Sequence, residues 1–460
     1  MSSFSLVNKI LTKETEEWLS YLYFQDLDHI KNCKPRYSGA FIRCCAFFFK
    51  LFYFFIFSLN KSKYKGNKID FYIYAGTANE ANSLVSTAKA LSEKNKVVSA
   101  DSRDKLLLNG ANNVFEFNQL DLQIRDILLA IILFLYNAPI FYLRLRKKNP
   151  LLANKFFNGF CEAYLYLPVF YRILRKHQPN FILVSNDHNV DCRSLLAVAY
   201  ALDIKTIYMQ HASVSNIFPA LTVSYAFLDG NSALNTYLEC ESNLSSFYKD
   251  RTLPKIFLTG QKKILNKIKS KSPKKIGLAI NSLDHVDKVI ELVNRLVDKG
   301  FKLILRWHPD QKYKDIVSIE NKFLRSKMVT LSYPQKEVIN DYLAKISHII
   351  SGNSSIHLEA AIFGVIPIYY EIQPSYINDY YGYVRNGLAY KLESFEDLII
   401  FLNKDLANKT NVASIQYYSA TYNTEWEGKE GELVANILID IQIGKPWINM
   451  FGAIEYSVHE

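Results

Sequence analysis

Two short polar segments in the second half of the chain combine the residue types that bind phosphate. The first, ILRWHPDQ, ends an apolar run and contains Arg306, His308 and Pro309. Pro309 fixes the turn and keeps His308 in an extended conformation. An imidazole placed there can donate a hydrogen bond to a phosphate oxygen and help a nucleotide leave, and Arg306 can add positive charge. A purely structural histidine in a turn is the alternative.

The second segment is HIISGNSSIHLEAAIFGVIPIYY, which predicts a strand, a polar loop, a helix and another strand. The first amides of a helix lack intrahelical partners and its dipole is positive there, so such a loop favours a phosphate. We expect Ser354 and Ser355 to donate to that phosphate. Glu359 can accept ribose hydroxyls or simply favour the helix dipole, and an ordinary helix cap is the alternative reading. The polar side chains of the segment are those of Ser351, Asn353, Ser354, Ser355 and Glu359.

A transfer of a group to a hydroxyl needs a general base, and the first half of the chain offers three. Asp187 follows the apolar run FILV and is the first choice, with His188 and His211 as runners-up. The alternative for Asp187 is a cap for the helix predicted over 190–202.

The apolar periods predict the elements that position these residues. Short apolar runs alternate with longer helical periods, which is typical of parallel α/β layers. Asn281 and Ser282 follow one such run and are expected to line the same ligand site as His308. The predicted strands are 69–76, 96–101, 181–187, 206–211, 223–230, 255–260, 275–281, 301–309, 329–333, 348–355 and 365–370. The predicted helical regions are 80–93, 121–176, 190–202, 284–300, 337–346, 356–364 and 431–441.

This pattern predicts an α/β protein with two doubly wound, Rossmann-like domains facing a cleft, the arrangement called GT-B. Ligands of open α/β sheets bind at the carboxyl ends of the strands, where the polar residues fall. The lysine-rich segment 261–274 reads as a linker. The predicted order is a helical extension (1–65), an acceptor-side domain (66–260), this linker, a nucleotide-sugar domain (275–430) and a final helix with a tail (431–460).

The polar pairs carry a family resemblance. His308-Pro309 and Ser354-Ser355 resemble the HP and SS motifs of bacterial GT-B sialyltransferases and of the capsule Kdo-transferase group, in which they contact the CMP part of a CMP-activated nonulosonic acid. The second half is also similar to CDP-glycerol glycerophosphotransferases. Residues 206–230 resemble the Gln-His-Gly segment of capsule transferases, with Ala212 in place of the glycine. The resemblance covers about 180–400.

The resemblance implies a glycosyltransferase that moves a CMP-activated sialic, pseudaminic or Kdo-like acid onto a glycan or lipid-linked acceptor, in synthesis of capsule or another surface polysaccharide. It implies no cofactor beyond the nucleotide sugar, and no metal, because GT-B sites stabilise the leaving phosphate with helix dipoles and side chains. Alternatives are a CDP-glycerol or UDP-sugar transferase, an epimerase of the same fold, and a non-catalytic GT-B-like scaffold.

Composition narrows the possible partners and compartment. The chain has 460 residues and a net charge of +11, but no helix-turn-helix, RNP or zinc-finger pattern, so we expect no nucleic acid partner. The 6 cysteines form no CxxC pair and are too sparse for a disulfide framework. The N-terminus does not read as a signal peptide, so we expect a cytoplasmic protein.

Two apolar stretches leave membrane contact open. Residues 40–59 are rich in phenylalanine and interrupted by Arg43 and Lys50, and residues 127–143 are followed by a run of cations. Each can be a packed helix, a monotopic contact at the inner face of the cytoplasmic membrane, or a short membrane span.

Overall fold

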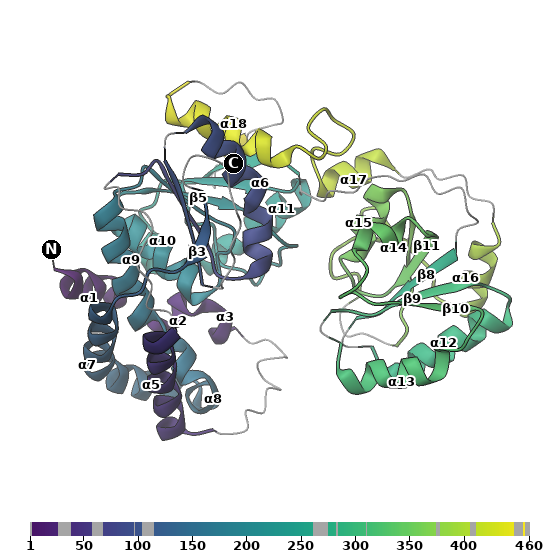
Figure 1. Cartoon of the computed structure of the whole chain (residues 1–460), viewed down its shortest axis with the longest axis horizontal. Helices are drawn as coiled ribbons and strands as arrows, with labels where there is room; N and C mark the ends of the chain where they lie inside the picture. Colours follow the sequence, from purple (N-terminus) through teal and green to yellow (C-terminus); the bar gives the residue numbers. More distant parts are fainter. Residues whose placement is uncertain are drawn as a thin grey trace. The chain divides into compact units, whose positions relative to one another are not determined.

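The chain folds into two compact units (Figure 1). Unit 1 comprises Met1–Gln261 and Lys429–Glu460, and unit 2 comprises Lys262–Gly428. This computed structural model describes residues 2–25, 38–57, 68–95, 97–103, 115–260, 275–281, 284–309, 311–373, 378–404, 411–445 and 454–455. The predicted linker 261–274 and the predicted site residue Ser282 lie outside the described residues.

Unit 1 is built on one twisted sheet with the strand order β14-β7-β6-β5-β4-β1-β2-β3. Its strands β1 to β7 are parallel, and β14 pairs antiparallel with β7. The central strands are buried along their length because helices cover both faces. The strands are β1 (Phe71–Ala75), β2 (Val98–Ser102), β3 (Phe117–Gln119), β4 (Phe181–Val184), β5 (Lys205–Met209), β6 (Tyr225–Leu228), β7 (Lys255–Leu258) and β14 (Ile454–Glu455).

The helices of unit 1 include several near the N-terminus and one from the far end of the chain. Val434, Ala435 and Leu438 of the last long helix are part of the hydrophobic core formed by the sheet of unit 1. The helices are α1 (Ser3–Lys13), α2 (Glu16–Leu19), α3 (Tyr21–Phe24), α5 (Ala40–Phe57), α6 (Ala78–Lys94), α7 (Ile124–Lys148), α8 (Pro150–Cys161), α9 (Ala163–His177), α10 (Val190–Ala201), α11 (Asn231–Glu239) and α18 (Glu430–Gln442), with short 3-10 turns at Cys240–Asn243 and Ser246–Tyr248.

Unit 2 has a smaller, fully parallel sheet with the order β10-β9-β8-β11-β12-β13. Its strands are β8 (Lys275–Ala279), β9 (Leu303–Arg306), β10 (Val329–Ser332), β11 (Ile346–Ser351), β12 (Ile366–Tyr369) and β13 (Tyr390–Lys391). Its helices are α12 (Val286–Asp298), α13 (Tyr313–Phe323), α14 (Ile339–Leu343), α15 (Ile356–Phe363), α16 (Phe395–Leu402) and α17 (Val412–Tyr418).

The predicted strands of both halves form, with ends shifted by a few residues, but the long helical region 121–176 differs from the prediction. The structure divides it into α7, α8 and α9. Asn149 ends α7 and caps α8 by accepting a hydrogen bond from the Leu152 N–H at 3.1 Å, and Pro150 stands at the first position of α8. The sequence prediction also lacked β3, α11, α13, β13, α16 and α17.

The order of strands determines where each unit can bind a ligand. In unit 1 the chain runs outward from β1 through β2 to β3, then returns to β4 on the other side of β1. In unit 2 it runs from β8 through β9 to β10, then returns to β11 on the other side of β8. At such a switch point the connections leave the sheet on opposite faces and open a crevice at the strand carboxyl ends.

Candidate active site

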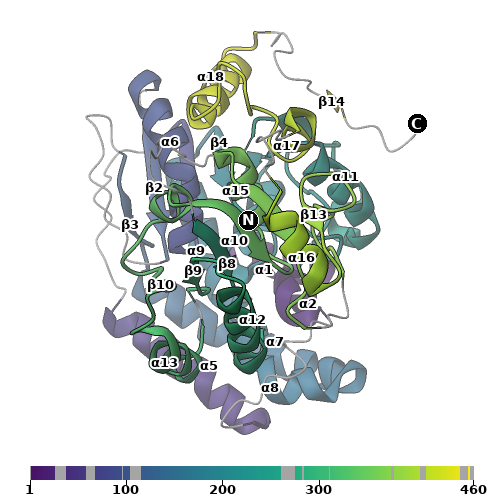
Figure 2. The same ribbon diagram turned by 90° about the vertical axis from the view of Figure 1, so that its right-hand side faces the viewer.

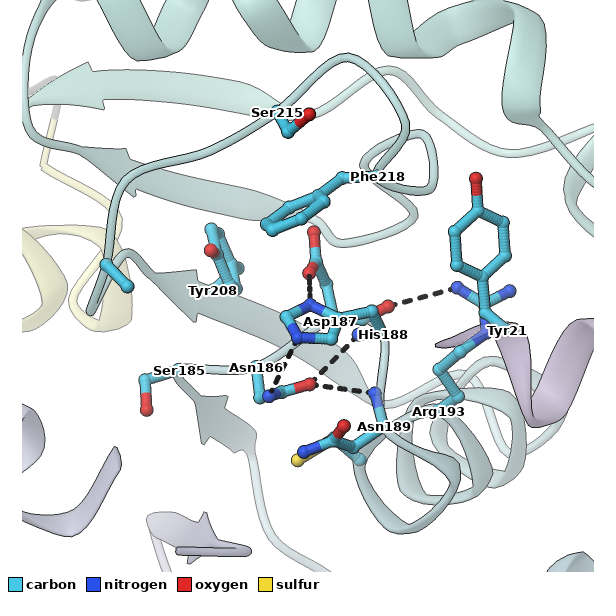
Figure 3. A network of polar contacts seen from close by, with 12 residues as sticks. Tyr21, Ser185, Asn186, Asp187, His188, Asn189, Arg193, Tyr208, Ser215 and Phe218 are labelled. Atoms are coloured by element: carbon cyan, nitrogen blue, oxygen red, sulfur yellow. Dashed lines mark hydrogen bonds and ion pairs between the residues drawn. The ribbon is translucent and has the colours of Figure 1, made fainter. Parts of the chain in front are cut away.

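The loop after β4 stands at the switch point of unit 1 and is held by Asn186 (Figure 3). The Asn186 carboxamide oxygen accepts hydrogen bonds from the backbone N–H groups of His188 and Asn189, both at 2.9 Å. These bonds form a turn before α10, whose N-cap residue is Asn189, so Asp187 is not the cap that the alternative reading assigned to it. The turn leaves the side chains of Asp187 and His188 for other contacts.

Asp187 and His188 form a hydrogen-bonded pair (Figure 3). The Asp187 Oδ1 atom lies 3.0 Å from His188 Nδ1. The other carboxylate oxygen of Asp187 accepts a hydrogen bond from the Tyr237 hydroxyl at 2.7 Å, and Arg193 donates to the Asp187 carbonyl at 3.1 Å. Asp187 is therefore buried and both its carboxylate oxygens are hydrogen-bonded, while the side chain of His188 is 17% exposed.

These contacts determine the tautomer of His188. A carboxylate only accepts hydrogen bonds, so the proton of the neutral imidazole belongs on Nδ1 and the lone pair on Nε2. The Asn186 carboxamide nitrogen lies 3.5 Å from Nε2, at the outer limit of hydrogen bonding. The ring also packs against Phe218, with centroids 4.7 Å apart. His188 thus has the chemical form of a general base.

His211 follows β5, the neighbour of β4, and lies beside this pair. Its Nδ1–H donates to the backbone carbonyl of Ser185, which again leaves the lone pair on Nε2. Burial lowers the pKa of His211, and the nearby His188 lowers it further. Burial therefore favours the neutral form of this second imidazole, against the opposing effect of its hydrogen bond to Ser185.

The sequence reasoning missed Glu80, which lies in the first turn of α6 at the same switch point. Its carboxylate accepts hydrogen bonds from the Gly76 N–H at 2.6 Å and from the Asn186 carboxamide at 3.2 Å. Burial raises the pKa of Glu80, and the charge of Asp191 raises it further. The signal was present in the sequence as Thr77 followed three residues later by Glu80, a capping-box pattern after a buried strand.

Because Gly76 has no side chain, the carboxylates of Glu80 and Asp191 can lie close to its backbone. A Cβ atom at this position would lie 2.5 Å from the Asp191 carboxylate and 3.2 Å from Glu80. Asp191 itself accepts a hydrogen bond from the Tyr74 hydroxyl at 2.8 Å and pairs with Arg103 at 3.5 Å. Two buried carboxylates therefore lie under the loop that carries His188.

In unit 2 the predicted phosphate-binding segments follow three adjacent strands. Ala279 of β8 is in register with Arg306 of β9, and Leu278 of β8 is in register with Ile350 of β11. Asn281, His308 and the loop 352–355 therefore leave the sheet at the same edge, on both sides of its switch point. His308 and Pro309 are exposed there.

Two predicted site residues of unit 2 have structural contacts instead. The Arg306 guanidinium donates to the Ser332 hydroxyl at 2.7 Å and to the Glu337 carbonyl at 3.1 Å, and it lies over the Tyr342 ring. Ser351 is fully buried, and its hydroxyl donates to the carbonyl of Ala279 at 2.7 Å. The contacts of Arg306 join β9 to β10 and to the β10–α14 connection, and the contact of Ser351 joins β11 to β8.

In the loop 352–355, called the serine loop, Gly352 is buried and Asn353, Ser354 and Ser355 are partly exposed. The Asn353 carboxamide oxygen accepts hydrogen bonds from the Tyr380 N–H at 2.9 Å and the Tyr369 hydroxyl at 3.2 Å. Within the described residues, the backbone N–H groups of Ser354 and Ser355 have no hydrogen-bond partner in the protein. They lie at the amino end of α15, where amide hydrogens and the helix dipole favour an anion. Glu359 is in the first turn of α15.

Comparison with known proteins shows the fold. No protein-family model matches the chain, and no curated protein matches it. It resembles the structure of a UDP-GlcNAc 2-epimerase from Methanocaldococcus jannaschii, with a TM-score of 0.50 and 17% identity over 81% of this chain and 99% of that one. It resembles a presumptive UDP-N-acetylglucosamine 2-epimerase from Listeria monocytogenes with a TM-score of 0.50 and 12% identity, over 84% of this chain and 100% of that one.

The predicted fold class is thereby confirmed. The chain has the GT-B fold of two Rossmann-like α/β domains with additional N-terminal helices. At 12% and 17% identity this likeness shows the fold alone.

Proposed function

We propose that this protein is a glycosyltransferase that moves a sugar from a nucleotide donor to a hydroxyl of a glycan or lipid-linked acceptor. The observation that carries the proposal is the pair of polar clusters at the two switch points. Unit 2 offers unpartnered amides at a helix N-terminus, and unit 1 offers an imidazole oriented by a carboxylate. Transfer of a sugar from a phosphate to a hydroxyl needs donors that stabilise the leaving phosphate and a base that accepts the hydroxyl proton.

In this proposal unit 2 binds the donor. The N–H groups of Ser354 and Ser355 and the dipole of α15 stabilise the departing phosphate, and His308 donates a further hydrogen bond. The charge that develops on the phosphate is thus met by protein dipoles without a metal ion. Asn281, Asn353 and Glu359 surround the nucleoside.

Unit 1 supplies the base. The acceptor hydroxyl attacks the anomeric carbon, the bond from that carbon to the nucleotide phosphate breaks, and the hydroxyl proton passes to His188 Nε2. Asp187 was the first choice for the base, but both its oxygens are engaged, so we assign it to orienting His188. His211 is the second candidate base.

The donor we favour is a CMP-activated nonulosonic acid, because the HP and SS pairs resemble those that contact CMP in the bacterial sialyltransferases. The pathway would be capsule or other surface polysaccharide synthesis. A UDP-linked donor is the main rival, because the two similar structures described above carry UDP-N-acetylglucosamine in their names.

Thermal unfolding in the presence of CMP, CDP, UDP and GDP tests the donor site. A nucleotide that binds the folded protein raises its Tm by mass action, and we expect the largest rise with CMP. His308→Ala should reduce the rise, whereas His348→Ala, inside β11, should not. No rise with any nucleotide would refute the donor site, and a larger rise with UDP would refute the CMP preference.

A reaction assay with and without acceptor separates the remaining classes. A transferase releases nucleotide in proportion to the added acceptor, whereas an epimerase converts the free nucleotide sugar without one. A scaffold binds nucleotide or glycan but turns over neither. For a transferase, His308→Ala should lower kcat by on the order of a hundredfold.

A further inference from the structure

Helix α7 has one apolar face that the described protein leaves uncovered. Its exposed side chains recur every three or four residues over the length of the helix, so they form a single stripe. The large apolar residues of this stripe are 53–69% exposed: Ile124, Leu128, Ile132, Leu135, Tyr136, Ile140 and Leu143. A stripe of this length is far larger than the scattered apolar residues of a soluble surface.

The opposite face of α7 is fixed to unit 1. Phe141 stacks on Phe157 of α8, and Asp126 pairs with Arg172 of α9 at 2.8 Å. Among the described helices, α7 alone is long and apolar enough to cross a membrane, and 39% of its most apolar window is buried in the protein. A helix whose other side carries a buried ion pair is better suited to lie in a membrane surface than to cross it.

Helix α5 extends the same surface. The two cations that interrupt its apolar sequence turn toward the protein: Lys50 pairs with Glu162 at 2.5 Å, and Arg43 donates to the Lys155 carbonyl at 3.2 Å. The outward side is therefore aromatic and aliphatic without a charge. Its large exposed residues are Phe41, Ile42, Phe48, Phe49, Phe52, Tyr53, Phe55 and Ile56.

The two helices lie side by side. Phe47 of α5 stacks on Phe134 of α7 with ring centroids 4.8 Å apart, and Phe48 meets the same ring edge-on at 5.0 Å. Figures 1 and 2 both show α5, α7 and α8 gathered at the end of unit 1 opposite α18. We call the exposed side chains of α5 and α7 given above the apolar face.

The charges at the two ends of α7 indicate what binds the apolar face. Arg125 stands at the first turn of α7, and Arg146 and Lys147 at its last turn, all exposed and without an acidic partner among the described residues. The one acidic residue of the two helices, Asp126, is buried. An apolar centre with cations at both ends is complementary to a bilayer whose head groups are anionic.

We infer that unit 1 docks on anionic lipid bilayers through the apolar face, with α5 and α7 lying in the plane of the interface. Side chains of the face enter the head-group and acyl boundary, and Arg125, Arg146 and Lys147 contact phosphates of the lipid head groups. This inference does not depend on the proposed reaction.

Flotation of the full chain with vesicles tests the inference. We expect binding to vesicles of phosphatidylcholine mixed with phosphatidylglycerol, and weaker binding to phosphatidylcholine alone. Leu135→Glu with Ile140→Glu should reduce the bound fraction at least about tenfold, because large apolar side chains leave the bilayer. Leu324→Glu is the matched control, since Leu324 is 67% exposed but lies in unit 2, and it should bind as wild type does.

A second variant isolates the charges. Arg146→Gln with Lys147→Gln should weaken binding to the anionic vesicles by about fivefold for each removed cation and leave binding to neutral vesicles unchanged. Absence of wild-type flotation with both vesicle types overturns the inference. A second outcome also overturns it. If the wild-type protein is an oligomer, and Leu135→Glu with Ile140→Glu makes it monomeric without changing its flotation, then a second copy of the chain covers the apolar face.

Discussion

At the scale of single residues, each group around His188 has a separate effect. Asn186 accepts from the backbone N–H groups of His188 and Asn189 and so fixes the loop, Asp187 fixes the ring and its tautomer, and Tyr237 fixes Asp187. A histidine without these partners would divide its proton between both nitrogens. The arrangement commits Nε2 to accepting a proton.

His188→Gln should therefore remove the base and leave the fold intact. We expect kcat of the transfer to fall by about 10²- to 10⁴-fold, while the Tm rise caused by nucleotide stays the same, because the donor site is in unit 2. His348→Gln is the control and should retain activity. A variant that loses nucleotide binding along with turnover would contradict the division of roles between the units.

His357, behind the serine loop, makes the stability of unit 2 depend on pH. The side chain is fully buried and contacts the Gly352 carbonyl at 2.9 Å through Nε2, and burial lowers its pKa to about 4 from 6.5. The unfolded chain binds a proton at a higher pH than the folded chain does. The contribution of neutral His357 is thus complete above pH 6.5 and is lost as the pH falls toward 4, up to about 3 kcal/mol.

Urea unfolding of wild type and His357→Gln at a series of pH values checks this dependence. Glutamine does not titrate, so the slope of stability against pH between the two pKa values should become smaller in the variant. His285→Gln, at an exposed position, should keep the wild-type slope. Equal slopes in wild type and His357→Gln would assign the pH dependence to other groups.

At the scale of elements, α7 and α9 are joined by a buried charge cluster. Arg172 of α9 donates to both carboxylate oxygens of Asp126, at 2.8 and 3.0 Å, and to Asp121 at 3.0 Å. Asp126 also accepts from the Gln123 N–H at the start of α7. The direction of α7, and hence of the apolar face, depends on this cluster.

Arg172→Met should cost about 3–5 kcal/mol of stability, because it leaves two carboxylates buried without their cation. Adding Asp126→Asn should recover part of the loss by removing one of the charges. Arg175→Met on the exposed side of α9 is the control and should change stability by less than about 0.5 kcal/mol. Chemical unfolding measures the stability of the three variants. If Arg172→Met unfolds at the wild-type midpoint, the charge cluster does not stabilise the protein.

At the scale of the whole molecule, the chain crosses from unit 1 to unit 2 and returns. The helix α18 packs its buried residues into the core of unit 1, although unit 2 precedes it directly in sequence. Gly431 allows its close approach to α6, since a Cβ atom there would lie 2.8 Å from the Thr87 backbone nitrogen.

Leu438→Ala should consequently destabilise unit 1, by about 2–5 kcal/mol, through the cavity left in its core. Hydrogen exchange should show faster exchange in β1 and α6 and unchanged exchange in β8 and β11. Ile443→Ala, whose side chain is 57% exposed, is the control and should leave both units unchanged. Equal loss of protection in the two units would mean that they unfold together.

The sequence by itself determined the layered α/β fold. Runs such as FILV and LIL are apolar on both faces and suit strands covered on both sides by helices, and this pattern is local, so it can be read without the fold. The polar residues after those runs were correctly predicted to follow strand ends.

Only the tertiary structure decided which of those residues are available for chemistry. Arg306 and Ser351 have partners that lie far away in sequence, Ser332 and Ala279, and Asp187 has its second oxygen occupied by Tyr237, fifty residues on. Such contacts depend on the order of strands, which no local pattern encodes. The apolar face also depends on the tertiary structure. The composition of 40–59 and 127–143 was compatible with a packed helix, a monotopic contact or a membrane span. Only the burial of one side of each helix shows which side chains remain exposed.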